Sequence, residues 1–229
     1  MTTLKRIGSA IFLVWGFLTF ISAMILVLPF IVICSALIKG KKGSDLIFFF
    51  LKIWGWIFCT LSFYPIFSKK DPAFDPNRAY IYVSNHNSYL DAVAVVITIP
   101  GSFKPLGKIE MVKIPIFGII YKRVAVMIDR ASKESRARSV EELKVDLANG
   151  QSILIFPEGT MNRTDKPLTD FYDGAFRLAI ETQTPIAPLA IINARKLFPR
   201  GNPLAARPGL ITCIFDKPVE GNTTHACHI

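Results

Sequence analysis

A histidine and an aspartate five positions apart, His86 and Asp91, are the residues of this sequence best suited to chemistry. A neutral imidazole oriented by a carboxylate can take a proton from a hydroxyl group at neutral pH. The sequence contains three histidines, and the other two lie within the last five residues. His86 is therefore the only histidine inside the expected folded domain, and a general base of this type has to be His86.

The spacing of this pair requires a turn between a strand and a helix. In one regular helix, residues five apart point about 140° away from each other and do not meet. We therefore expect a strand at 80–83, an N-cap at Asn87 or Ser88, and a helix from Leu90 onwards. Asp91 then lies in the first helical turn and can reach back to the imidazole. A structural alternative exists, because Ser88 and Asp91 nearly match a capping box.

Further blocks of similar character follow the histidine block. They are Lys108-Ile109-Glu110 with Ile128-Asp129-Arg130, then Phe156-Pro157-Glu158-Gly159-Thr160, and then Pro185-Ile186-Ala187-Pro188-Leu189. In order and spacing, the four blocks resemble the glycerolipid acyltransferase family, which includes the 1-acylglycerol-3-phosphate (lysophosphatidic acid) acyltransferases. The resemblance covers about residues 80 to 192. Its most specific part is the NHxxxxD block followed by FPEGT about seventy residues later.

The resemblance implies a role for each matching residue. His86 is the general base that deprotonates the acceptor hydroxyl, Asp91 orients it, and the hydroxyl attacks an acyl thioester directly, without an acyl-enzyme. Lys108 and Arg130 match basic positions that hold the acceptor phosphate. The full set of expected substrate-binding residues is Asn85, Lys108, Arg130, Glu158, Gly159, Thr160 and Arg163. Backbone N–H groups around Gly159 could also stabilise the oxyanion of the tetrahedral intermediate.

One departure from the family pattern concerns the acceptor head group. The family block usually continues FPEGTRS, whereas Met161 and Asn162 follow FPEGT in this sequence. The usual arginine is therefore missing, and Arg163 or Arg177 is the candidate to supply its charge.

A second departure lies just before Gly174-Ala175-Phe176, where the family has a basic residue. Tyr172 and Asp173 occupy these positions instead. A lyso-amino-acid lipid of the ornithine or glycine type is therefore an alternative acceptor to a plain phosphate. Taken singly, Lys108 and Arg130 could also be solvated surface charges, and FPEGT could be an ordinary turn after a buried strand.

Apolar residues are concentrated at the N-terminus. Hydrophobic residues make up 51% of the sequence, which is high for a soluble domain of this length. Residues 10–38 form an almost uninterrupted apolar run, and residues 46–67 form a second one, broken mainly by Lys52. Either run is long enough to cross a bilayer. A cleaved signal peptide does not fit, because the first run is too long.

The distribution of basic residues favours a hairpin that enters one leaflet. If both runs crossed, the basic pairs at 5–6 and 69–70 would share one side, and the basic turn at 39–42 would lie on the other. That arrangement opposes the positive-inside tendency. A hairpin, with Pro29 as a kink in its first helix, keeps all these residues at the cytoplasmic surface. We expect an inner-membrane protein with its catalytic domain facing the cytoplasm; a two-span anchor is the alternative.

The net charge of +10 indicates which partners to expect. Residues 1–70 contain eight Lys or Arg and one acidic residue, and residues 104–138 contain nine and three. Basic residues beside apolar helices suit an anionic lipid surface, whereas nucleic-acid-binding proteins carry basic stripes on a soluble face. The second cluster could receive acceptor phosphate, coenzyme A or acyl carrier protein. We expect membrane lipids, with lysophosphatidic acid as acceptor and acyl carrier protein or acyl coenzyme A as donor, and no nucleic acid.

No metal or organic cofactor is expected. The four cysteines show no CxxC spacing and are interpreted as reduced thiols. The tail contains His225, Cys227 and His228, but a terminal cluster without a second group of ligands is more typical of an unstructured end.

From residue 71 onwards the sequence predicts a single α/β domain. After the strand at 80–83 and its helix, we expect a strand at 124–128, a helix at 139–149 that begins with a capping box, a strand at 153–156, a helix at 175–181, and strands at 186–192 and 210–215. This alternation implies a central, largely parallel sheet covered by helices, preceded by an N-terminal two-helix membrane-embedded hairpin. The expected division is a membrane anchor at 1–68, a linker at 69–78, an α/β acyltransferase domain at 79–220 and a tail at 221–229.

The function expected from these features is transfer of a fatty acyl group to the 2-hydroxyl of 1-acylglycerol 3-phosphate, giving phosphatidic acid in phospholipid synthesis. Three alternatives remain. The acceptor could be a lyso-amino-acid lipid, the chain could bind lipid at a membrane without turnover, or water could replace the acceptor in a hydrolase.

Overall fold

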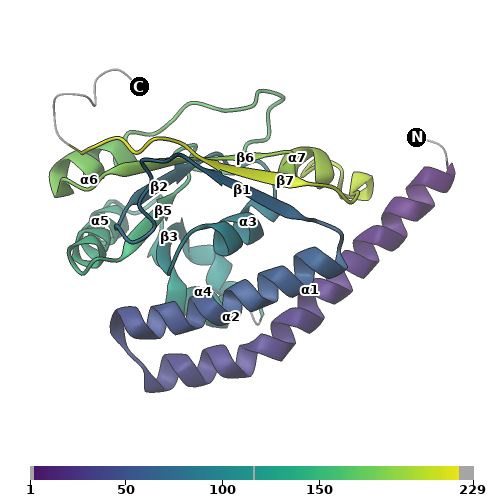
Figure 1. Cartoon of the computed structure of the whole chain (residues 1–229), viewed down its shortest axis with the longest axis horizontal. Helices are drawn as coiled ribbons and strands as arrows, with labels where there is room; N and C mark the ends of the chain where they lie inside the picture. The colour runs from purple at the N-terminus through teal and green to yellow at the C-terminus, as the bar shows by residue number, and fades with distance from the viewer. Residues whose placement is uncertain (1–2, 116, 222–229) are drawn as a thin grey trace.

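The computed structural model describes residues 3–115 and 117–221 (Figure 1). Within these residues, strands form one sheet with the order β1-β7-β6-β2-β5-β3-β4. All neighbouring strands are parallel except β6 and β7, which are antiparallel. The strands are β1 (Ile66–Lys70), β2 (Ile81–Ser84), β3 (Phe103–Lys108), β4 (Val126–Ile128), β5 (Ser152–Ile155), β6 (Ile186–Ile192) and β7 (Ile211–Phe215). A mixed α/β architecture with a mostly parallel sheet is confirmed.

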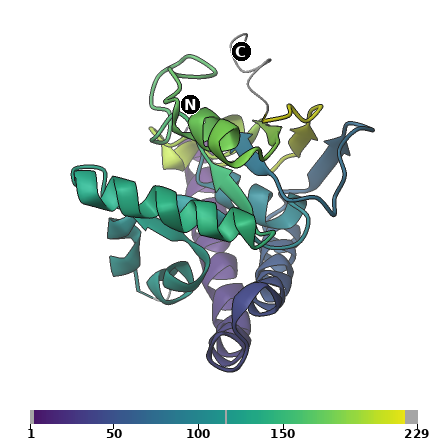
Figure 2. The ribbon, with the colours of Figure 1, turned by 90° about the vertical axis from the view of Figure 1, so that its left-hand side faces the viewer.

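Helices cover both faces of the sheet. They are α1 (Thr3–Leu37), α2 (Gly40–Leu61), α3 (Leu90–Thr98), α4 (Phe117–Val124), α5 (Lys133–Ala148), α6 (Gly174–Thr182) and the short α7 (Ala194–Leu197), with 3-10 turns at Ile109–Lys113 and Pro203–Ala205. Figure 1 shows the hairpin of α1 and α2 running along one side of the sheet beside α3 and α4, with α5 and α6 away from it. Figure 2, seen from the side of α5, shows the end of the hairpin below the α/β core.

Alternation along the central strands sorts their side chains between two cores. Tyr82 and Leu154 belong to the larger core, which also contains residues of α1, α2 and α3. Ile81 and Ile153 point to the opposite face and belong to the smaller core, which is closed by α5 and α6. Because successive residues of a strand face opposite ways, the central strands are apolar on both sides.

The N-terminal hairpin shares its core with the α/β domain. The ring of Phe48 in α2 lies 4.6 Å from that of Phe103 in β3. Asp45 Oδ1, one turn earlier, accepts hydrogen bonds from the Ser102 N–H (3.2 Å) and Oγ (2.6 Å). Helix α2 is amphipathic, since its buried residues recur at helical spacing, so one face packs on α3 while the other remains exposed. The two-helix hairpin is thus part of the folded body.

Both helices of this hairpin meet the length and composition of a membrane span. The apolar stretches cover Arg6–Leu37 and Gly40–Leu61. Helix α1 contains Pro29 and changes direction along its length in Figure 1. Many of its large apolar side chains are exposed, among them Ile11, Val14 and Leu18. This exposed apolar surface is consistent with membrane association.

The expected boundary between anchor and linker needs correction. Strand β1 pairs in parallel with β7, from Ile66 opposite Ile211 to Lys70 opposite Phe215. The boundary at 68–69 therefore falls inside a strand, and the linker begins only after Lys70. The strand was missed because it lies at the sheet edge, where the residues that follow Ile66 are all exposed and show no apolar alternation. Of the expected tail at 221–229, residues 222–229 lie outside the described residues.

Helix α5 begins at Lys133, earlier than the expected start at Ser139. Its N-cap is Ser132, whose Oγ accepts a hydrogen bond from the Ser135 N–H (3.1 Å). Ser139 lies inside the helix, and its hydroxyl donates to the Arg136 carbonyl. The early start was missed because the first turns are mostly exposed and polar, so they lack an apolar stripe.

The segment between α3 and α5 was only partly predicted. Residues 124–128 were expected to be a strand, but Val124 ends α4 and the strand is Val126–Ile128. Strand β3 was not predicted, because it contains Pro105 and Gly107, which usually argue against a strand. The sheet accommodates Pro105 because β3 changes partner after this residue, from β5 to β4.

Candidate active site

The turn between β2 and α3 brings His86 and Asp91 into contact. His86 Nδ1 lies 3.0 Å from Asp91 Oδ2, so the hydrogen bond predicted from the spacing is present. The Asp91 side chain is fully buried, whereas that of His86 is 21% exposed. When Nδ1–H donates to the carboxylate, Nε2 is the unprotonated nitrogen and can accept a proton. The pair therefore has the geometry of a carboxylate-oriented general base.

Asp91 also organises the backbone of this turn. The same Oδ2 atom accepts hydrogen bonds from the N–H groups of Asn87 and Ser88, both at 2.7 Å. Ser88 Oγ in turn accepts a hydrogen bond from the Leu90 N–H (3.2 Å). The capping interpretation of Ser88 and Asp91 and the orienting interpretation are therefore compatible. The N-cap residue itself is Tyr89, so the expectation of an N-cap at Asn87 or Ser88 was wrong by one or two residues.

The FPEGT block lies directly beside this turn. Strands β2 and β5 are parallel neighbours, so their carboxyl ends meet at one edge of the sheet. The His86 ring stacks on Phe156 with centroids 4.2 Å apart. The His86 N–H donates to Glu158 Oε1 (2.8 Å), and the His86 carbonyl accepts from the Asn162 N–H (2.7 Å). These contacts fix the position of the histidine through its backbone as well as its ring.

Two of the expected substrate-binding residues have their polar atoms engaged within the protein. Glu158 is 3% exposed, and its Oε2 accepts from both the N–H (3.0 Å) and the hydroxyl (2.8 Å) of Thr169. The Asn85 amide donates to the Ile191 carbonyl (3.0 Å) and accepts from the Ile191 N–H (2.7 Å), which joins the end of β2 to β6. The structure places both side chains as supports of the site.

Gly159 allows a basic and an aromatic side chain to approach the FPEGT turn. Its φ of +69° is a conformation that glycine adopts without strain. A Cβ atom here would lie 2.7 Å from the Tyr172 ring and 3.3 Å from Arg130 Nη1. The Gly159 N–H donates to the Phe156 carbonyl (3.0 Å), so this N–H is not free to bind an oxyanion.

The two expected phosphate-binding residues come from neighbouring strand ends. Lys108 is the last residue of β3 and pairs in register with Ile128 of β4, two residues before Arg130. Both basic side chains are exposed. Tyr121 lies near Arg130: burial raises its pKa to about 12, although the Arg130 guanidinium opposes this rise. The Tyr121 hydroxyl is therefore protonated at neutral pH.

The residues considered as substitutes for the missing arginine lie in different settings. Arg163 is exposed on the loop that follows FPEGT, and Thr160, the last residue of the block, is exposed as well. Arg177 forms an ion pair with Asp173 at 2.6 Å on the exposed face of α6. The arginine that contacts Met161 is instead Arg200, whose Nη1 donates to the Met161 carbonyl at 2.9 Å. Sequence reasoning missed Arg200, since it lies 39 positions further along the chain and belongs to no motif.

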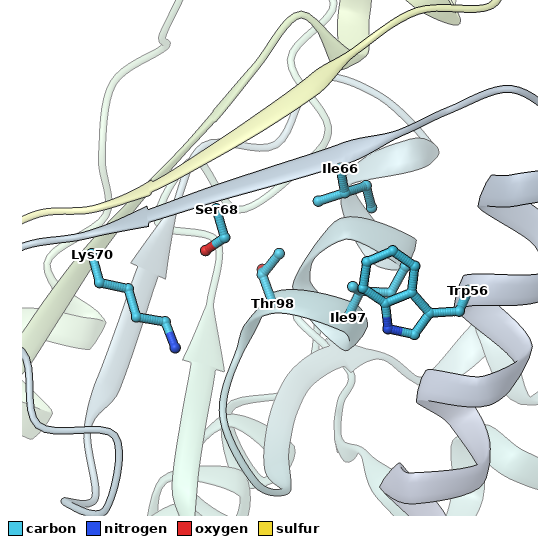
Figure 3. Close-up of a pocket in the computed structure, with 6 residues that line it drawn as sticks. All are labelled: Trp56, Ile66, Ser68, Lys70, Ile97 and Thr98. Carbon is cyan, nitrogen blue, oxygen red and sulfur yellow. The ribbon is translucent and has the colours of Figure 1, made fainter.

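A cavity elsewhere contains none of these residues. It lies between α2, β1 and α3, has a volume of about 460 Å³, and is lined by Trp56, Ile66, Ser68, Lys70, Ile97 and Thr98 (Figure 3). Among residues 3–115 and 117–221, no three His, Cys, Asp or Glu side chains are grouped as metal ligands. The tail with His225, Cys227 and His228, which was not expected to bind a metal, lies outside this part of the chain.

Comparison with known proteins assigns the family. The acyltransferase family model matches residues 67–192, which include the His86 turn and the FPEGT block. The chain belongs to this acyltransferase family. The match spans more than half of the chain and agrees with the resemblance seen in the four sequence blocks.

Several relatives of this acyltransferase have names that state an activity. A 1-acyl-sn-glycerol-3-phosphate acyltransferase of Chlamydomonas reinhardtii is 26% identical over 96% of this chain and 65% of its own length. The human 1-acyl-sn-glycerol-3-phosphate acyltransferase alpha is 32% identical over 52% of this chain and 42% of its own length. The chain thus matches only about two fifths to two thirds of the length of these relatives.

A crystal structure shares the fold. The 1-acyl-sn-glycerophosphate (LPA) acyltransferase PlsC from Thermotoga maritima superimposes with a TM-score of 0.80. The match covers 96% of this chain and 89% of PlsC at 21% sequence identity. The likeness extends beyond the α/β domain, because that coverage includes most of the N-terminal hairpin.

Proposed function

We propose that this acyltransferase transfers a fatty acyl group from an acyl thioester to the 2-hydroxyl of 1-acylglycerol 3-phosphate, giving phosphatidic acid. The observation that carries the proposal is the His86–Asp91 hydrogen bond, located at the carboxyl end of a parallel sheet beside the FPEGT turn. The activity in the names of its relatives supports this choice of acceptor. The donor is a thioester of acyl carrier protein or of coenzyme A.

The proposed reaction is a direct transfer. His86 Nε2 removes the proton from the acceptor hydroxyl while the hydroxyl oxygen attacks the thioester carbonyl carbon. The tetrahedral intermediate then collapses, the carbon–sulfur bond breaks, and the leaving thiolate takes the proton from the imidazolium. Asp91 is a buried anion 3.0 Å from Nδ1, so it stabilises the imidazolium that exists between the two steps.

The acceptor phosphate is proposed to lie among three basic side chains around the FPEGT turn. Lys108 is the last residue of β3, and Arg130 lies in the loop after β4. Arg200 lies in the loop after α7. Arg200 is connected to His86 through the Met161–Asn162 segment, because Arg200 contacts the Met161 carbonyl and the Asn162 N–H contacts the His86 carbonyl. Arginine is well suited to this task, since its planar guanidinium can bind phosphate with two hydrogen bonds.

The α1–α2 hairpin is proposed to enter one leaflet of the inner membrane, with the α/β domain on the cytoplasmic side. The exposed apolar residues of α1 support insertion, and the packing of α2 along the α/β domain supports a position at the membrane surface. The lipid acceptor would then reach the site without leaving the membrane.

A transfer assay with the full chain tests the reaction. Labelled acyl coenzyme A and acyl carrier protein are supplied with lysophosphatidic acid, lyso-amino-acid lipids or no acceptor. The contacts of His86 with Glu158 and Asn162 use its backbone, so His86→Ala should fold, which a thermal unfolding curve can verify. We expect this variant to lose roughly 10²- to 10⁴-fold in turnover, the usual contribution of a general base.

The acceptor arms of this assay separate the proposal from its alternatives. Wild-type turnover by folded His86→Ala would exclude the mechanism. Acylation of only the amino-acid lipid would show that this lipid is the acceptor. Thioester loss without any acceptor would indicate a hydrolase. Lipid binding without consumption of thioester would indicate a binding protein.

A further inference from the structure

The cavity between α2, β1 and α3 has one apolar and one polar end. Trp56, Ile66 and Ile97 form the apolar part, and Ser68, Lys70 and Thr98 form the polar part. Figure 3 shows Ile66, Ser68 and Lys70 on the same side of β1, opposite the side chains from α3 and α2. The volume of about 460 Å³ is within the range of small-molecule sites. A cavity with this division suits an amphiphile.

The polar end lies at the edge of the sheet opposite the His86 turn. Strand β1 is parallel to β7, β7 is antiparallel to β6, and β6 is parallel to β2. β1 therefore runs antiparallel to β2, and Lys70, at the C-terminal end of β1, lies at the end of the sheet where β2 begins. Helix α3 starts beside His86 and ends at Thr98, which places Thr98 at that same edge. The cavity is thus separate from the proposed acceptor site.

A second lysine adds to the positive charge at this end. Lys52 of α2 lies one turn before Trp56 and is half-buried. Burial lowers its pKa, and the positive charge of nearby Lys70 lowers it further. Among residues 3–115 and 117–221, neither lysine has an ion-pair partner, since the nearby Asp45 binds Ser102 and pairs with Lys41. The Lys70 ammonium lies 5.6 Å and 5.7 Å from the ring centroids of Phe74 and Phe215. An ammonium group without a carboxylate partner favours an anionic ligand.

The surroundings of the cavity favour a ligand that is itself in the membrane. Trp56 is 51% exposed, and Phe49, two turns earlier on α2, is exposed as well. Tryptophan commonly lies at the membrane interface, and lysines beside such aromatic residues bind lipid phosphates.

We propose that this cavity binds the phosphate head group of an anionic membrane phospholipid, with Lys70 on the phosphate and the chain end of the lipid along Trp56 and Ile97. This second site anchors the sheet edge to anionic membranes and does not depend on the proposed acyl transfer.

The test compares the vesicle binding of two variants. Each lacks one lysine of β1, Lys69 or Lys70, and the two lysine side chains point to opposite faces of the strand because these residues are neighbours. The full chain is mixed with phosphatidylcholine vesicles that contain or lack phosphatidic acid, and binding is measured by co-sedimentation. Lys69→Ala should weaken binding by about fivefold, the general effect of one lysine near an anionic surface. Lys70→Ala should weaken it by more than about tenfold, because a charged hydrogen bond is lost.

A variant without a change in charge tests the cavity itself. Ser68→Leu fills the space beside Lys70 and should reduce binding to phosphatidic acid vesicles while leaving binding to phosphatidylcholine alone unchanged. Transfer activity in detergent should stay at the wild-type level in both Lys70→Ala and Ser68→Leu, which separates this site from the catalytic one. Equal losses for Lys69→Ala and Lys70→Ala would overturn the proposal, as would binding of soluble glycerol phosphate at Lys70 without any effect on vesicles.

Discussion

At the residue scale, a single carboxylate oxygen of Asp91 performs two tasks. It accepts one hydrogen bond from the His86 ring and two from the backbone of the turn that carries the ring. The turn geometry and the orientation of the imidazole are therefore fixed by the same atom. Such coupling reduces the freedom of His86 before any substrate binds, which is an advantage for a group that must meet a hydroxyl at hydrogen-bond distance.

Arg200 is expected to contribute to binding of the acceptor phosphate. Arg200→Ala should raise the KM for lysophosphatidic acid by about tenfold or more, because a hydrogen bond to a charged partner contributes about 1.5–3 kcal/mol. The KM for the acyl donor and the melting temperature should change little. Steady-state kinetics with varied acceptor and a fixed donor measure this effect, and Arg200→Lys should recover part of the loss.

Arg195 offers a matched control for this measurement. Its guanidinium also contacts the loop after FPEGT, with hydrogen bonds to the Lys166 carbonyl and to Asp165, both at 3.1 Å. Arg195→Ala should leave the KM for the acceptor unchanged. If both variants lower kcat and stability to the same extent, Arg200 only supports the loop and does not bind phosphate.

The sequence predicted the centre of the site better than its periphery. The His86–Asp91 contact depends on a short local turn, so spacing and residue type were sufficient. The roles of Asn85 and Glu158 depend on partners far along the chain, Ile191 and Thr169, and no local pattern reveals such pairing. Arg200 was missed for the same reason, because its contact with Met161 exists only in the folded chain.

At the scale of elements, burial decided which strands and helices could be predicted. The strand at 186–192 was predicted with its observed bounds, and β2, β5 and β7 were each predicted within one residue at either end. These strands lie inside the sheet and carry apolar side chains. The exposed edge strand β1 and the Pro-containing β3 were missed, and the polar start of α5 was placed too late. Apolar periodicity in a sequence indicates which residues are buried, so it does not predict elements that lack a buried apolar stripe.

The contact of α2 with α3 leads to a prediction about stability. A Cβ atom on Gly55 would lie 2.9 Å from Ile97 Cγ1 and 3.1 Å from its Cδ1, whereas one on Gly16 in α1 would meet only Ser62 Oγ at 3.9 Å. Gly→Ala increases helix propensity equally at both positions. Gly55→Ala should therefore be less stable than Gly16→Ala by about 1–3 kcal/mol, the usual effect of overpacking. Denaturant unfolding in detergent measures the difference.

The same pair of variants tests whether the hairpin and the α/β domain form one folded unit. A single unfolding transition that shifts as a whole in Gly55→Ala is expected, because α2 and α3 share a core. Equal stability of the two variants would mean that α2 does not pack on α3 in solution.

At the scale of the whole molecule, α2 is held to the α/β domain close to the hairpin turn as well as along its length. Residues of the turn, Lys39, Gly40 and Lys41, line one hollow together with Lys104 of β3 and Arg123 of α4. The hydrogen bonds between Asp45 and Ser102 lie next to this hollow. A crossing of the bilayer by both helices would carry the turn to the other side and break the Asp45–Ser102 hydrogen bonds, which supports the proposed insertion into one leaflet.

The last prediction concerns the side of the membrane on which this turn lies. Single cysteines at Lys41 in the turn and Lys217 in the α/β domain should react with a membrane-impermeant maleimide from the same, cytoplasmic, side. Cys227 is first replaced by serine. Cys59 and Cys213 can remain, since burial raises their pKa values to about 12 and about 11, which leaves little reactive thiolate. Cys34 is buried as well. Labelling in inverted vesicles but not in intact spheroplasts, for both variants, is the expected result. Labelling of Lys41→Cys only in spheroplasts and of Lys217→Cys only in inverted vesicles would mean that both helices cross the membrane. The packing of α2 against the α/β domain would then not persist in the membrane.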